Sequence, residues 1–512
     1  MAIKIGMLVI FFGVMIGVGL YCRKHSTDVN GFVLGGRSVG PWLTAFAYGT
    51  SYFSAVVFVG YAGQFGWKYG IAATWAGIGN AILGSLIAWV VLGRRTRVMT
   101  QHLDSATMPQ FFERRFSSKA LKLAASAIIF VFLIPYTASL YNGLSRLFGM
   151  AFDIDYSVCV IVMAVLTAIY VIAGGYMATA INDFIQGMIM IVGIIAVIVA
   201  VLNAQGGLAA ALSELGKVVD PAVSTEPGAF NSFFGPDPVN LLGVVILTSL
   251  GTWGLPQMVQ KFYAIKSEQA IKKGTIISTV FALVVAGGCY FLGGFGRLFS
   301  DKVDVATEGF DAIIPAMLSD LSPLLIAVVV VLVLSASMST LSSLVLASSS
   351  TLTLDFIKGT IVKKLSEKKQ LLIMRLLIVV FILISVILAL IQYNSSVTFI
   401  AQLMGISWGA LAGAFLAPFL YSLYWKRVTK PAVWVNFVFS TIVMLANIVA
   451  KDWFPVVLQS PINAGAFCML AGLVIVPVVS LLTKRPDGEL VAHVFSCYDR
   501  KVEVTAKDSI GD

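Results

Sequence analysis

The sequence predicts an all-α polytopic membrane protein whose core consists of two five-helix repeats inserted in opposite orientations. Three observations support this fold class. The chain of 512 residues is 58% hydrophobic and only 12% charged, whereas a soluble domain carries about 25% charged residues. Apolar stretches long enough to cross a bilayer recur along its whole length. Two of them, five spans apart, carry residues that interrupt a helix, a pattern typical of inverted-repeat membrane folds.

Thirteen segments are predicted to span the membrane. They cover residues 4–22, 42–65, 70–93, 119–147, 156–174, 180–202, 239–261, 271–296, 322–354, 371–392, 397–424, 431–450 and 463–483. The first is predicted to be a retained helix, because it lacks a charged n-region beyond Lys4 and a small-residue cleavage site.

The predicted membrane domain covers residues 1–483, and residues 484–512 are predicted to form a polar cytoplasmic tail. Within the membrane domain, the first repeat is expected at 42–202 and the second at 239–424. The segments 4–22, 431–450 and 463–483 are additional helices. An odd number of spans in each repeat makes the two halves insert in opposite orientations.

The basic residues predict the orientation in the membrane. With the N-terminus outside and the C-terminus inside, most of the 35 lysines and arginines, Lys261 among them, fall on the cytoplasmic side, where positive charge is retained. The exceptions are Lys4, Lys68, Arg146, Lys217, Arg297, Lys302 and Lys451. The net charge of +10 is therefore a topology signal, and nucleic acid is not an expected partner. We expect a multi-pass protein of the inner (plasma) membrane, surrounded by lipid, with a monomeric functional unit.

The cysteines and histidines predict neither a disulfide nor an organic cofactor. The five cysteines are scattered and show no CxxC or Cys/His metal spacing. The three histidines, His25, His102 and His493, lie in predicted cytoplasmic loops. A histidine proton relay through the membrane is therefore disfavoured.

The segment from Leu334 to Ser343 carries the most informative pattern. It places five serines and a threonine within an otherwise apolar span. On a helix, Ala336, Ser339, Thr340 and Ser343 share one face. Hydroxyls in the hydrocarbon layer line either a packed helix interface or a polar site. Their number here favours an ion site, because neutral oxygens are ligands that a hard monovalent cation prefers.

Two spans are predicted to be broken near the middle of the membrane. The second contains glycine and hydroxyl residues between Tyr48 and Ala55, and the seventh contains Gly251, Gly254 and Pro256. Proline removes a backbone donor and clashes with the preceding turn, so the seventh span is expected to kink or break.

These residues resemble the sodium:solute symporter family, most closely its sodium/proline symporter branch, from the first span to the last. The matching motifs are Leu34-Gly-Gly-Arg-Ser-Val-Gly40, Ala173-Gly-Gly-Tyr176 followed by Asn182-Asp183, Gly254-Leu-Pro-Gln257 and Ser337-Met-Ser-Thr-Leu-Ser342. The resemblance implies a LeuT-like fold and alternating access driven by inward sodium flow. The expected function is sodium-coupled import of a small organic solute.

By the same resemblance, a first sodium site uses the backbone carbonyls of Thr50 and Phe53 at the break of the second span. The ninth span is expected to supply the carbonyl of Ala336 and the hydroxyls of Ser339 and Thr340. The residues themselves agree, because a helix break frees carbonyl groups that face this hydroxyl-rich span.

A second sodium site is implied for some family members, and here it matches Asp183, Ser342 and Ser343, together with Ser339. An unpaired acid in the membrane is costly, which favours a cation as the partner of Asp183. A helix N-cap at the inner interface is the other interpretation of Asp183.

The substrate is expected beside the two breaks. The family positions are Ser54, Tyr136 and Pro256, and the neighbours added from the sequence are Thr252, Trp253, Gln257, Gln402 and Trp408. Aromatic walls with a few polar groups suit a small ligand. No buried lysine or arginine is expected to receive a substrate carboxylate, so free amides at a half-helix N-terminus and a bound sodium ion would hold it.

Substitutions in the first broken helix narrow the substrate class. The proline branch has an acidic residue where this chain has Tyr52, so this chain departs from that branch at a position linked to coupling. Sugar-transporting relatives carry Asn, Glu and Gln side chains along this helix that bind hydroxyls, whereas Tyr52, Val56 and Val57 occupy the stretch in this chain. A small amino acid such as proline, or a small carboxylate, fits best; pantothenate or a sugar is the alternative solute.

Other functional classes fit less well. A membrane enzyme is disfavoured because the sequence has no HExxH motif, no histidine in a predicted span and no paired acids within the spans. A channel is disfavoured because the hydroxyls are confined to one helix. Two alternatives are consistent with the sequence. One is a proton-coupled transporter of the same fold with Asp183 as the titrating group, and the other is a sensor that has lost transport.

Overall fold

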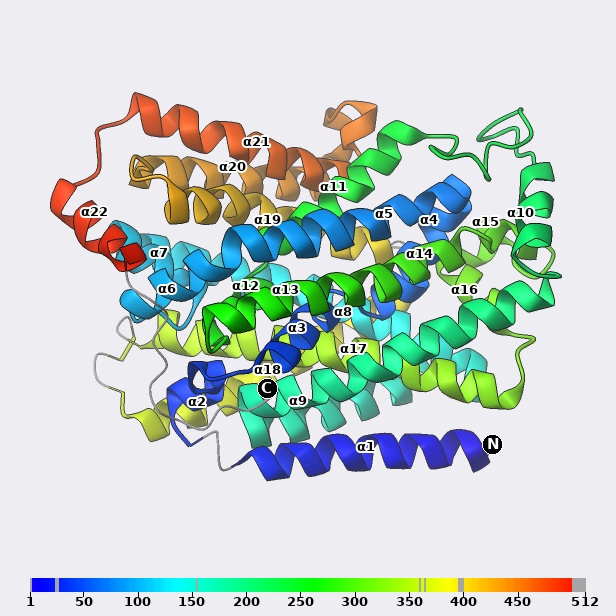
Figure 1. Cartoon of the computed structure of the whole chain (residues 1–512), viewed down its shortest axis with the longest axis horizontal. Coiled ribbons are helices and arrows are strands. Elements are labelled where there is room, and N and C mark those ends of the chain that lie inside the picture. The colour runs from blue at the N-terminus through cyan, green and yellow to red at the C-terminus, as the bar shows by residue number, and fades with distance from the viewer. Residues whose placement is uncertain are drawn as a thin grey trace.

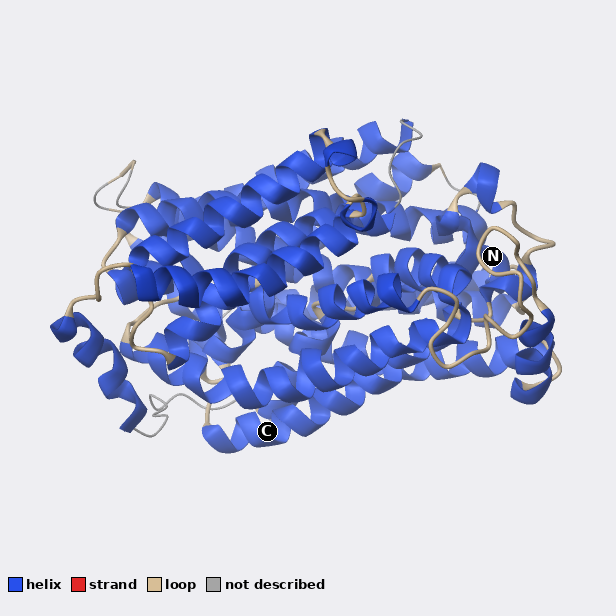
Figure 2. Ribbon diagram, turned by 90° about the horizontal axis from the view of Figure 1, so that it is seen from above, coloured by secondary structure: helices blue, strands red, loops and turns tan. Residues whose placement is uncertain are grey.

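The computed structural model describes residues 2–23, 27–152, 155–358, 361–362, 365–394 and 400–499, and within these ranges the chain is a bundle of helices (Figures 1 and 2). The part of the predicted tail from 500 to 512 lies outside the described residues, as do Lys24, His25, Lys363 and Lys364. The longer helices are α1 (Ala2–Cys22), α3 (Pro41–Thr50), α4 (Ala62–Tyr69), α6 (Arg94–His102), α7 (Met108–Phe116), α8 (Lys119–Phe152), α9 (Tyr156–Ala204), α10 (Leu208–Lys217), α11 (Pro238–Gly254), α12 (Pro256–Ala264), α13 (Glu268–Ala282), α17 (Pro323–Thr351), α18 (Glu367–Asn394), α19 (Ile400–Tyr424), α20 (Lys430–Val449), α21 (Pro461–Leu482) and α22 (Gly488–Phe495). Short helices that matter below are α2 (Val29–Leu34), α5 (Thr74–Gly79), α14 (Gly288–Gly293), α15 (Val305–Glu308) and α16 (Ile313–Leu318), with η3 (Val56–Tyr61), η5 (Asn80–Ile87), η8 (Gly296–Phe299) and η10 (Leu352–Ile357).

Among the described residues, ten helices are long and apolar enough to cross a membrane, and eleven if the bent pair α11 and α12 is one span. The predicted second and third spans, 42–65 and 70–93, are not counted as two separate helices, because helical structure runs without a gap from residue 56 to 102. The predicted fifth and sixth spans both lie in α9, which kinks at Gly175 with φ of 55°. The count of thirteen spans and the sidedness of the termini stay predictions.

Both predicted helix breaks are present. The first interrupts the helical path after α3, and helical structure resumes as the π-helix η3. The second lies at Leu255, whose extended backbone separates α11 from α12 with a bend of 45°. Pro256 occupies the first turn of α12, where its missing N–H is tolerated. The residues that interrupt these spans therefore act as the sequence predicts.

The two broken helices are tied together at one end. The backbone N–H of Val39, just before α3, donates to the carbonyl of Ala264 at the end of α12 (3.1 Å), and Lys266 N–H donates back to the Val39 carbonyl (3.0 Å). This short bridge fixes the start of α3 beside the end of α12.

The helix α17 carries the hydroxyl-rich segment through the interior. Its N-cap Ser322 accepts a hydrogen bond from Leu325 N–H, and Pro323 occupies the first turn. It packs against α1, α8, α9 and α18, and from Val329 to Thr351 every side chain is buried. The hydroxyls of this helix therefore face protein on all sides.

The two ends of the bundle differ in character. The basic helices α6 and α7 gather with α22 at one end, and α10, α15 and α16 lie at the other (Figure 1). We call the first the basic end of the bundle and the second the α10 end.

Candidate ion and substrate site

The break after α3 frees carbonyl groups in the interior. The helix ends at Thr50, and residues 51–54 are not helical. The carbonyls of Thr50 and Phe53 therefore lack the usual helical partner four residues further on. Both residues are fully buried, so bulk water does not reach these oxygens and they need a partner inside the protein.

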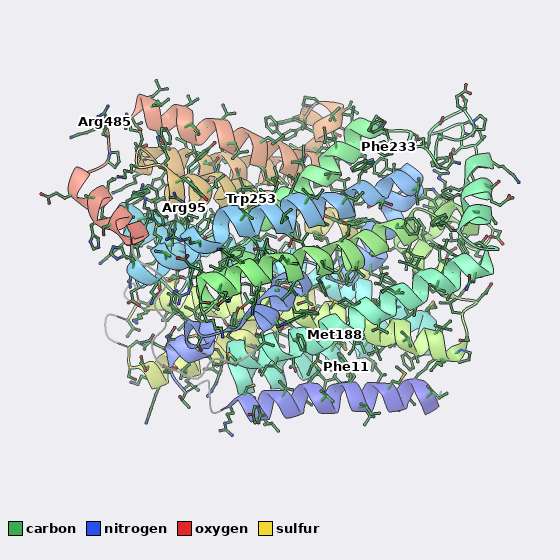
Figure 3. The ribbon with its side chains drawn as sticks, in the orientation of Figure 1. Phe11, Arg95, Met188, Phe233, Trp253 and Arg485 are labelled. Carbon is green, nitrogen blue, oxygen red and sulfur yellow. The ribbon has the colours of Figure 1, made fainter. Side chains whose placement is uncertain are left out.

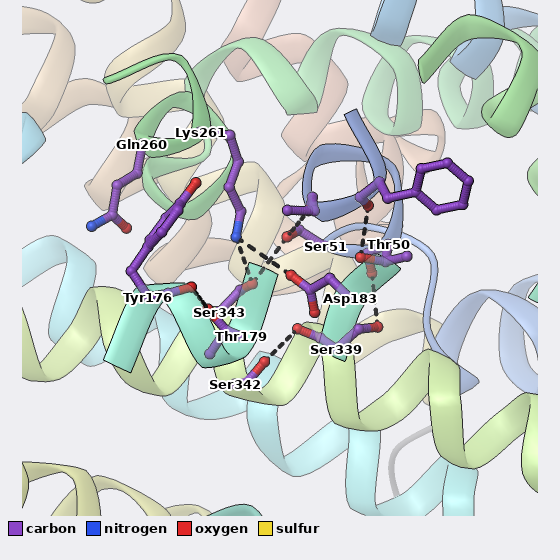
Figure 4. A network of polar contacts seen from close by, with 12 residues as sticks. Thr50, Ser51, Tyr176, Thr179, Asp183, Gln260, Lys261, Ser339, Ser342 and Ser343 are labelled. Atoms are coloured by element: carbon purple, nitrogen blue, oxygen red, sulfur yellow. Dashed lines mark hydrogen bonds and ion pairs between the residues drawn. The ribbon is translucent and has the colours of Figure 1, made fainter. Parts of the chain in front are cut away.

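Helix α17 supplies the hydroxyls that face this break (Figure 4). Thr340 Oγ1 lies 3.0 Å from the Thr50 carbonyl oxygen, 3.2 Å from that of Phe53 and 3.1 Å from that of Ala336. Ser339 Oγ lies 3.3 Å from the Thr50 oxygen and 3.1 Å from the Ala336 oxygen. The residues predicted for the first sodium site thus come together at one point.

The oxygens at this point outnumber the protons that could join them. Thr340 and Ser339 each have a single hydroxyl proton to donate, yet three carbonyl oxygens lie within hydrogen-bond distance of them. Clustered neutral oxygens with too few protons are suited to a hard cation, which accepts several oxygen ligands at once.

A second polar cluster lies one turn further along α17. Ser343 Oγ is 3.0 Å from Ser51 Oγ, next to the first break. Ser342 Oγ donates to the carbonyl of Ser339 at 2.9 Å. Asp183, on the second half of α9, is fully buried, and neither of its carboxylate oxygens has a hydrogen-bond partner among the described residues.

Lys261 enters this second cluster from α12. Its Nζ lies 3.8 Å from Asp183 Oδ2 and donates to Ser343 Oγ at 3.0 Å, and its side chain is 3% exposed. The sequence predicts no buried lysine or arginine that receives a substrate carboxylate and places Lys261 on the cytoplasmic side, whereas the structure buries Lys261 beside Asp183. Sequence reasoning missed Lys261 because it falls near the predicted end of the seventh span. The break at Leu255 starts a new helix there and turns the residue inward.

Several predicted substrate residues have buried polar atoms without partners. Among the described residues, no hydrogen-bond partner is found for Ser54 Oγ, Tyr136 OH, either side-chain atom of Gln257, or Trp408 Nε1. The Tyr136 hydroxyl lies close to the side chains of Ser54 and Trp408, and its ring meets the Trp408 ring edge-on at 6.0 Å. Unsatisfied buried polar atoms are rare in proteins, and a group of them marks a place where a ligand or water completes the bonding.

Thr252 and Trp253 are engaged elsewhere. Thr252 Oγ1 lies 2.9 Å from the carbonyl of Gly84, and the indole N–H of Trp253 (labelled in Figure 3) donates to the carbonyl of Leu83 at 2.9 Å. These polar groups join α11 to η5 rather than facing Ser54 and Tyr136. The sequence could not show this, because the partners lie far away in the chain.

The predicted residue Gln402 lies in the lining of a cavity of about 1250 Å³. The starts of α11 and α21 line the same cavity, and so do Pro135 and Ile406. Since Pro135 precedes Tyr136 in the chain, this cavity reaches the neighbourhood of the unpartnered polar groups.

Two further tyrosines were not predicted. The hydroxyls of Tyr61 and Tyr290 are fully buried, and no hydrogen-bond partner is found for them among the described residues. The sequence could have indicated them, because each is a tyrosine in an otherwise apolar helix, and a buried tyrosine hydroxyl normally has a hydrogen-bond partner.

The fold and this cluster define a class of protein: a polytopic helical membrane protein with two broken helices and a group of neutral oxygens between the first break and α17. Residues 32–438 match the model of the sodium:solute symporter family. The osmoregulated proline transporter OpuE of Bacillus subtilis is 30% identical over 93% of this chain and 94% of its own length. A sodium/proline symporter of Staphylococcus aureus is 31% identical over 94% and 93%.

The chain therefore belongs to the sodium:solute symporter family, a family of sodium-coupled transporters and not of enzymes. Its fold is shared with a Na⁺-coupled sialic acid symporter, solved in a substrate-bound outward-open state, with a TM-score of 0.73 over 95% of this chain and 99% of that one. The identity is 15%, so this likeness concerns the fold alone.

Proposed function

We propose that this chain imports a small amino acid, with proline as the first candidate. Its entry would be coupled to a sodium ion bound by the oxygens around Thr340. The contact between the Thr340 hydroxyl and the Thr50 and Phe53 carbonyls supports the ion site most directly. The proline transporters among the relatives support the solute class.

A sodium ion at this cluster would be held by the carbonyl oxygens of Thr50, Phe53 and Ala336 and the hydroxyl oxygens of Ser339 and Thr340. It would tie α17 to the first broken helix. Because the ion would link two elements, it can favour one arrangement of them over another, and coupling follows if the solute prefers the same arrangement.

The solute would lie between the two breaks, against Ser54, Tyr136, Gln257 and Trp408. The unpartnered atoms of these residues support this placement, because each can exchange a hydrogen bond with the polar groups of an amino acid. Pro256 would contribute by opening the backbone at Leu255. The cavity beside Pro135 supports an entry route from the α10 end.

The topology we propose has thirteen spans, with the N-terminus outside and the C-terminus inside. The two five-helix repeats would cover residues 42–202 and 239–424. The gathering of the basic helices α6 and α7 at one end of the bundle supports this orientation.

Uptake into proteoliposomes tests the function. Radiolabelled proline, other small amino acids, pantothenate, short monocarboxylates and glucose would each be offered under an inward sodium gradient, and again under potassium with a proton gradient. Sodium-driven uptake of proline is the expected result. Uptake driven by protons alone would overturn the sodium site, and sodium-driven uptake of a different compound would overturn the solute assignment.

A further inference from the structure

We propose that Lys261 is the resident cation of the second polar cluster, so that this chain couples each solute to one sodium ion and not to two. The inference rests on the proposed function, since it concerns the number of ions that accompany the solute. It replaces the second sodium ion expected at Asp183 with a charge that belongs to the protein.

The ammonium group is enclosed by groups that would otherwise surround a free cation (Figure 4). Its Nζ lies 3.8 Å from Asp183 Oδ2, 3.0 Å from Ser343 Oγ and 5.1 Å from the centre of the Tyr176 ring. The side chain of Lys261 is 3% exposed and that of Asp183 0%. A carboxylate, a hydroxyl and an aromatic face are the partners that a desolvated ammonium group prefers.

The hydroxyls of the cluster are oriented by the ammonium group. An ammonium group can only donate hydrogen bonds, so Ser343 Oγ accepts from Lys261. Ser343 can then donate its own proton to Ser51 Oγ, while Ser51 donates to the carbonyl of Ala47. This chain of donors leads from the second broken helix through α17 to the first, and it uses the lone pairs that a sodium ion would need.

Charge balance gives the second reason. Within the described part of the chain, the ion pair of Asp183 is formed with Lys261, and together these two groups are neutral. A sodium ion placed between Asp183 and Ser343 would add a second positive charge beside the ammonium group. An excess charge is strongly unfavourable in an interior that water does not reach.

The position of Lys261 on α12 has a consequence for transport. A tethered ammonium group is not released to the other side of the membrane, so it draws no energy from the sodium gradient. It can still join α9, α12 and α17 as a free ion would. Solute accumulation should therefore rise with the first power of the sodium gradient rather than with its square.

The test measures sodium stoichiometry in purified protein and in proteoliposomes. Binding of radioactive sodium would be counted per protein molecule, and the Hill coefficient of sodium-stimulated proline uptake would be measured alongside. The variants are Lys261→Gln, Asp183→Asn and the double variant, with Lys261→Arg retaining a cation. Lys272→Gln, which removes an exposed lysine of α13, is the matched control.

The wild type, Asp183→Asn and Lys272→Gln are expected to bind one sodium ion with a Hill coefficient close to one. Lys261→Gln leaves the carboxylate without its cation and is expected to bind a second sodium ion, with the Hill coefficient rising toward two. The double variant should return to one ion, and Lys261→Arg should keep one. Sodium binding is measured without transport, so a variant that no longer moves solute still reports its ion count.

Two results would overturn the inference. One is a wild type that binds two sodium ions and loses one of them in Asp183→Asn. The other is a Lys261→Gln protein that still binds a single ion but needs far more solute for half-maximal uptake, which would make Lys261 a ligand of the solute. Failure of the proposed function is distinguishable, because a wild type without any sodium binding or sodium-stimulated uptake would contradict both.

Discussion

Thr340 Oγ1 lies 3.2 Å from the carbonyl oxygen of Phe53, although the two residues are 287 positions apart in the chain. This contact joins the unbroken helix α17 to the break that follows α3. An ion bound at this contact would have ligands on both helices, so its affinity would depend on their relative position. Such a dependence is required if ion binding is to be coupled to a change of conformation.

The first prediction concerns that contact. Thr340→Ala removes one ligand oxygen and should raise the sodium concentration for half-maximal uptake at least about tenfold, since a hydrogen bond or ligand to a charged group contributes about 1.5–3 kcal/mol. Thr340→Ser keeps the hydroxyl and should stay near the wild type. Ser339→Ala should act in the same direction as Thr340→Ala.

Ser350→Ala is the control for these variants, because Ser350 lies on the same helix and its hydroxyl bonds to the Leu346 carbonyl of its own helix at 2.7 Å. Sodium titrations of proline uptake, with membrane insertion checked by immunoblot, provide the measurement. An unchanged sodium requirement in both Thr340→Ala and Ser339→Ala would refute the site.

The second prediction concerns the solute. Tyr136→Phe removes a buried hydroxyl that has no hydrogen-bond partner in the described structure, so folding should be preserved while the solute loses a polar contact. The half-saturation concentration for proline should rise about fivefold to tenfold, the range expected for one neutral hydrogen bond, and the sodium requirement should change little.

Tyr421→Phe serves as its control, since the Tyr421 hydroxyl donates to the Leu473 carbonyl at 2.9 Å and joins α19 to α21. If both variants transport proline with wild-type kinetics, the placement of the solute beside Tyr136 is wrong.

A third prediction tests the close packing of the second break. A Cβ atom at Gly254 would lie 2.8 Å from Ala412 Cα and 2.8 Å from the Leu416 nitrogen. Gly254→Ala must push α11 away from α19, because backbone atoms cannot rotate aside, and overpacking of this kind costs about 1–3 kcal/mol.

The melting temperature in detergent should therefore fall in Gly254→Ala. In Gly149→Ala it should be unchanged or slightly higher, because nothing lies within 4 Å of a Cβ at Gly149 and alanine is favoured over glycine in a helix. Equal melting temperatures for the two variants would argue against the packing described for α11 and α19.

The fourth prediction concerns the loop before α11. Arg297 of η8 donates to Asp220 Oδ2 at 2.8 Å, while its guanidinium group lies 4.0 Å from the centre of the Phe230 ring. The hydrogen bond from Arg297 lowers the pKa of Asp220 below its usual value. Because the pKa of Asp220 is lowered, the ion pair with Arg297 stabilises the packed loop fully at pH values above the ordinary pKa of aspartate. This stabilisation is lost as the pH falls through the lowered pKa and the carboxylate is protonated.

The protection factors of the amides in residues 218–235, which compare each exchange rate with the intrinsic rate at the same pH, should therefore be high at neutral pH and fall in acid. Arg297→Gln should show fast exchange already at neutral pH. Lys302→Gln, whose partner Asp320 is exposed, should leave the exchange of this loop unchanged. Slow exchange in Arg297→Gln at neutral pH would show that the ion pair does not hold the loop.

Features that depend on near neighbours in the chain could be predicted from the residues alone. Apolar length gave the membrane helices, Pro256 gave the bend of the seventh span, and the spacing of Ser339 and Thr340 placed their hydroxyls on one face of α17. Each of these follows from helical periodicity or from the backbone chemistry of a single residue. The family motifs added the carbonyls of Thr50 and Phe53 on the opposite side.

Contacts between side chains on different helices could not be predicted in this way and became visible in the folded chain. From the sequence, Lys261 is predicted to lie on the cytoplasmic side at the end of a span. In the structure, the break at Leu255 starts the new helix α12, and Lys261 on this helix lies beside Asp183. From the sequence, Thr252 and Trp253 are predicted to line the substrate pocket. In the structure, their polar groups donate to backbone carbonyls of η5. The physical reason is common to both cases. The direction in which a helix face points is set by its packing against helices distant in sequence, and periodicity defines a face without saying what it meets.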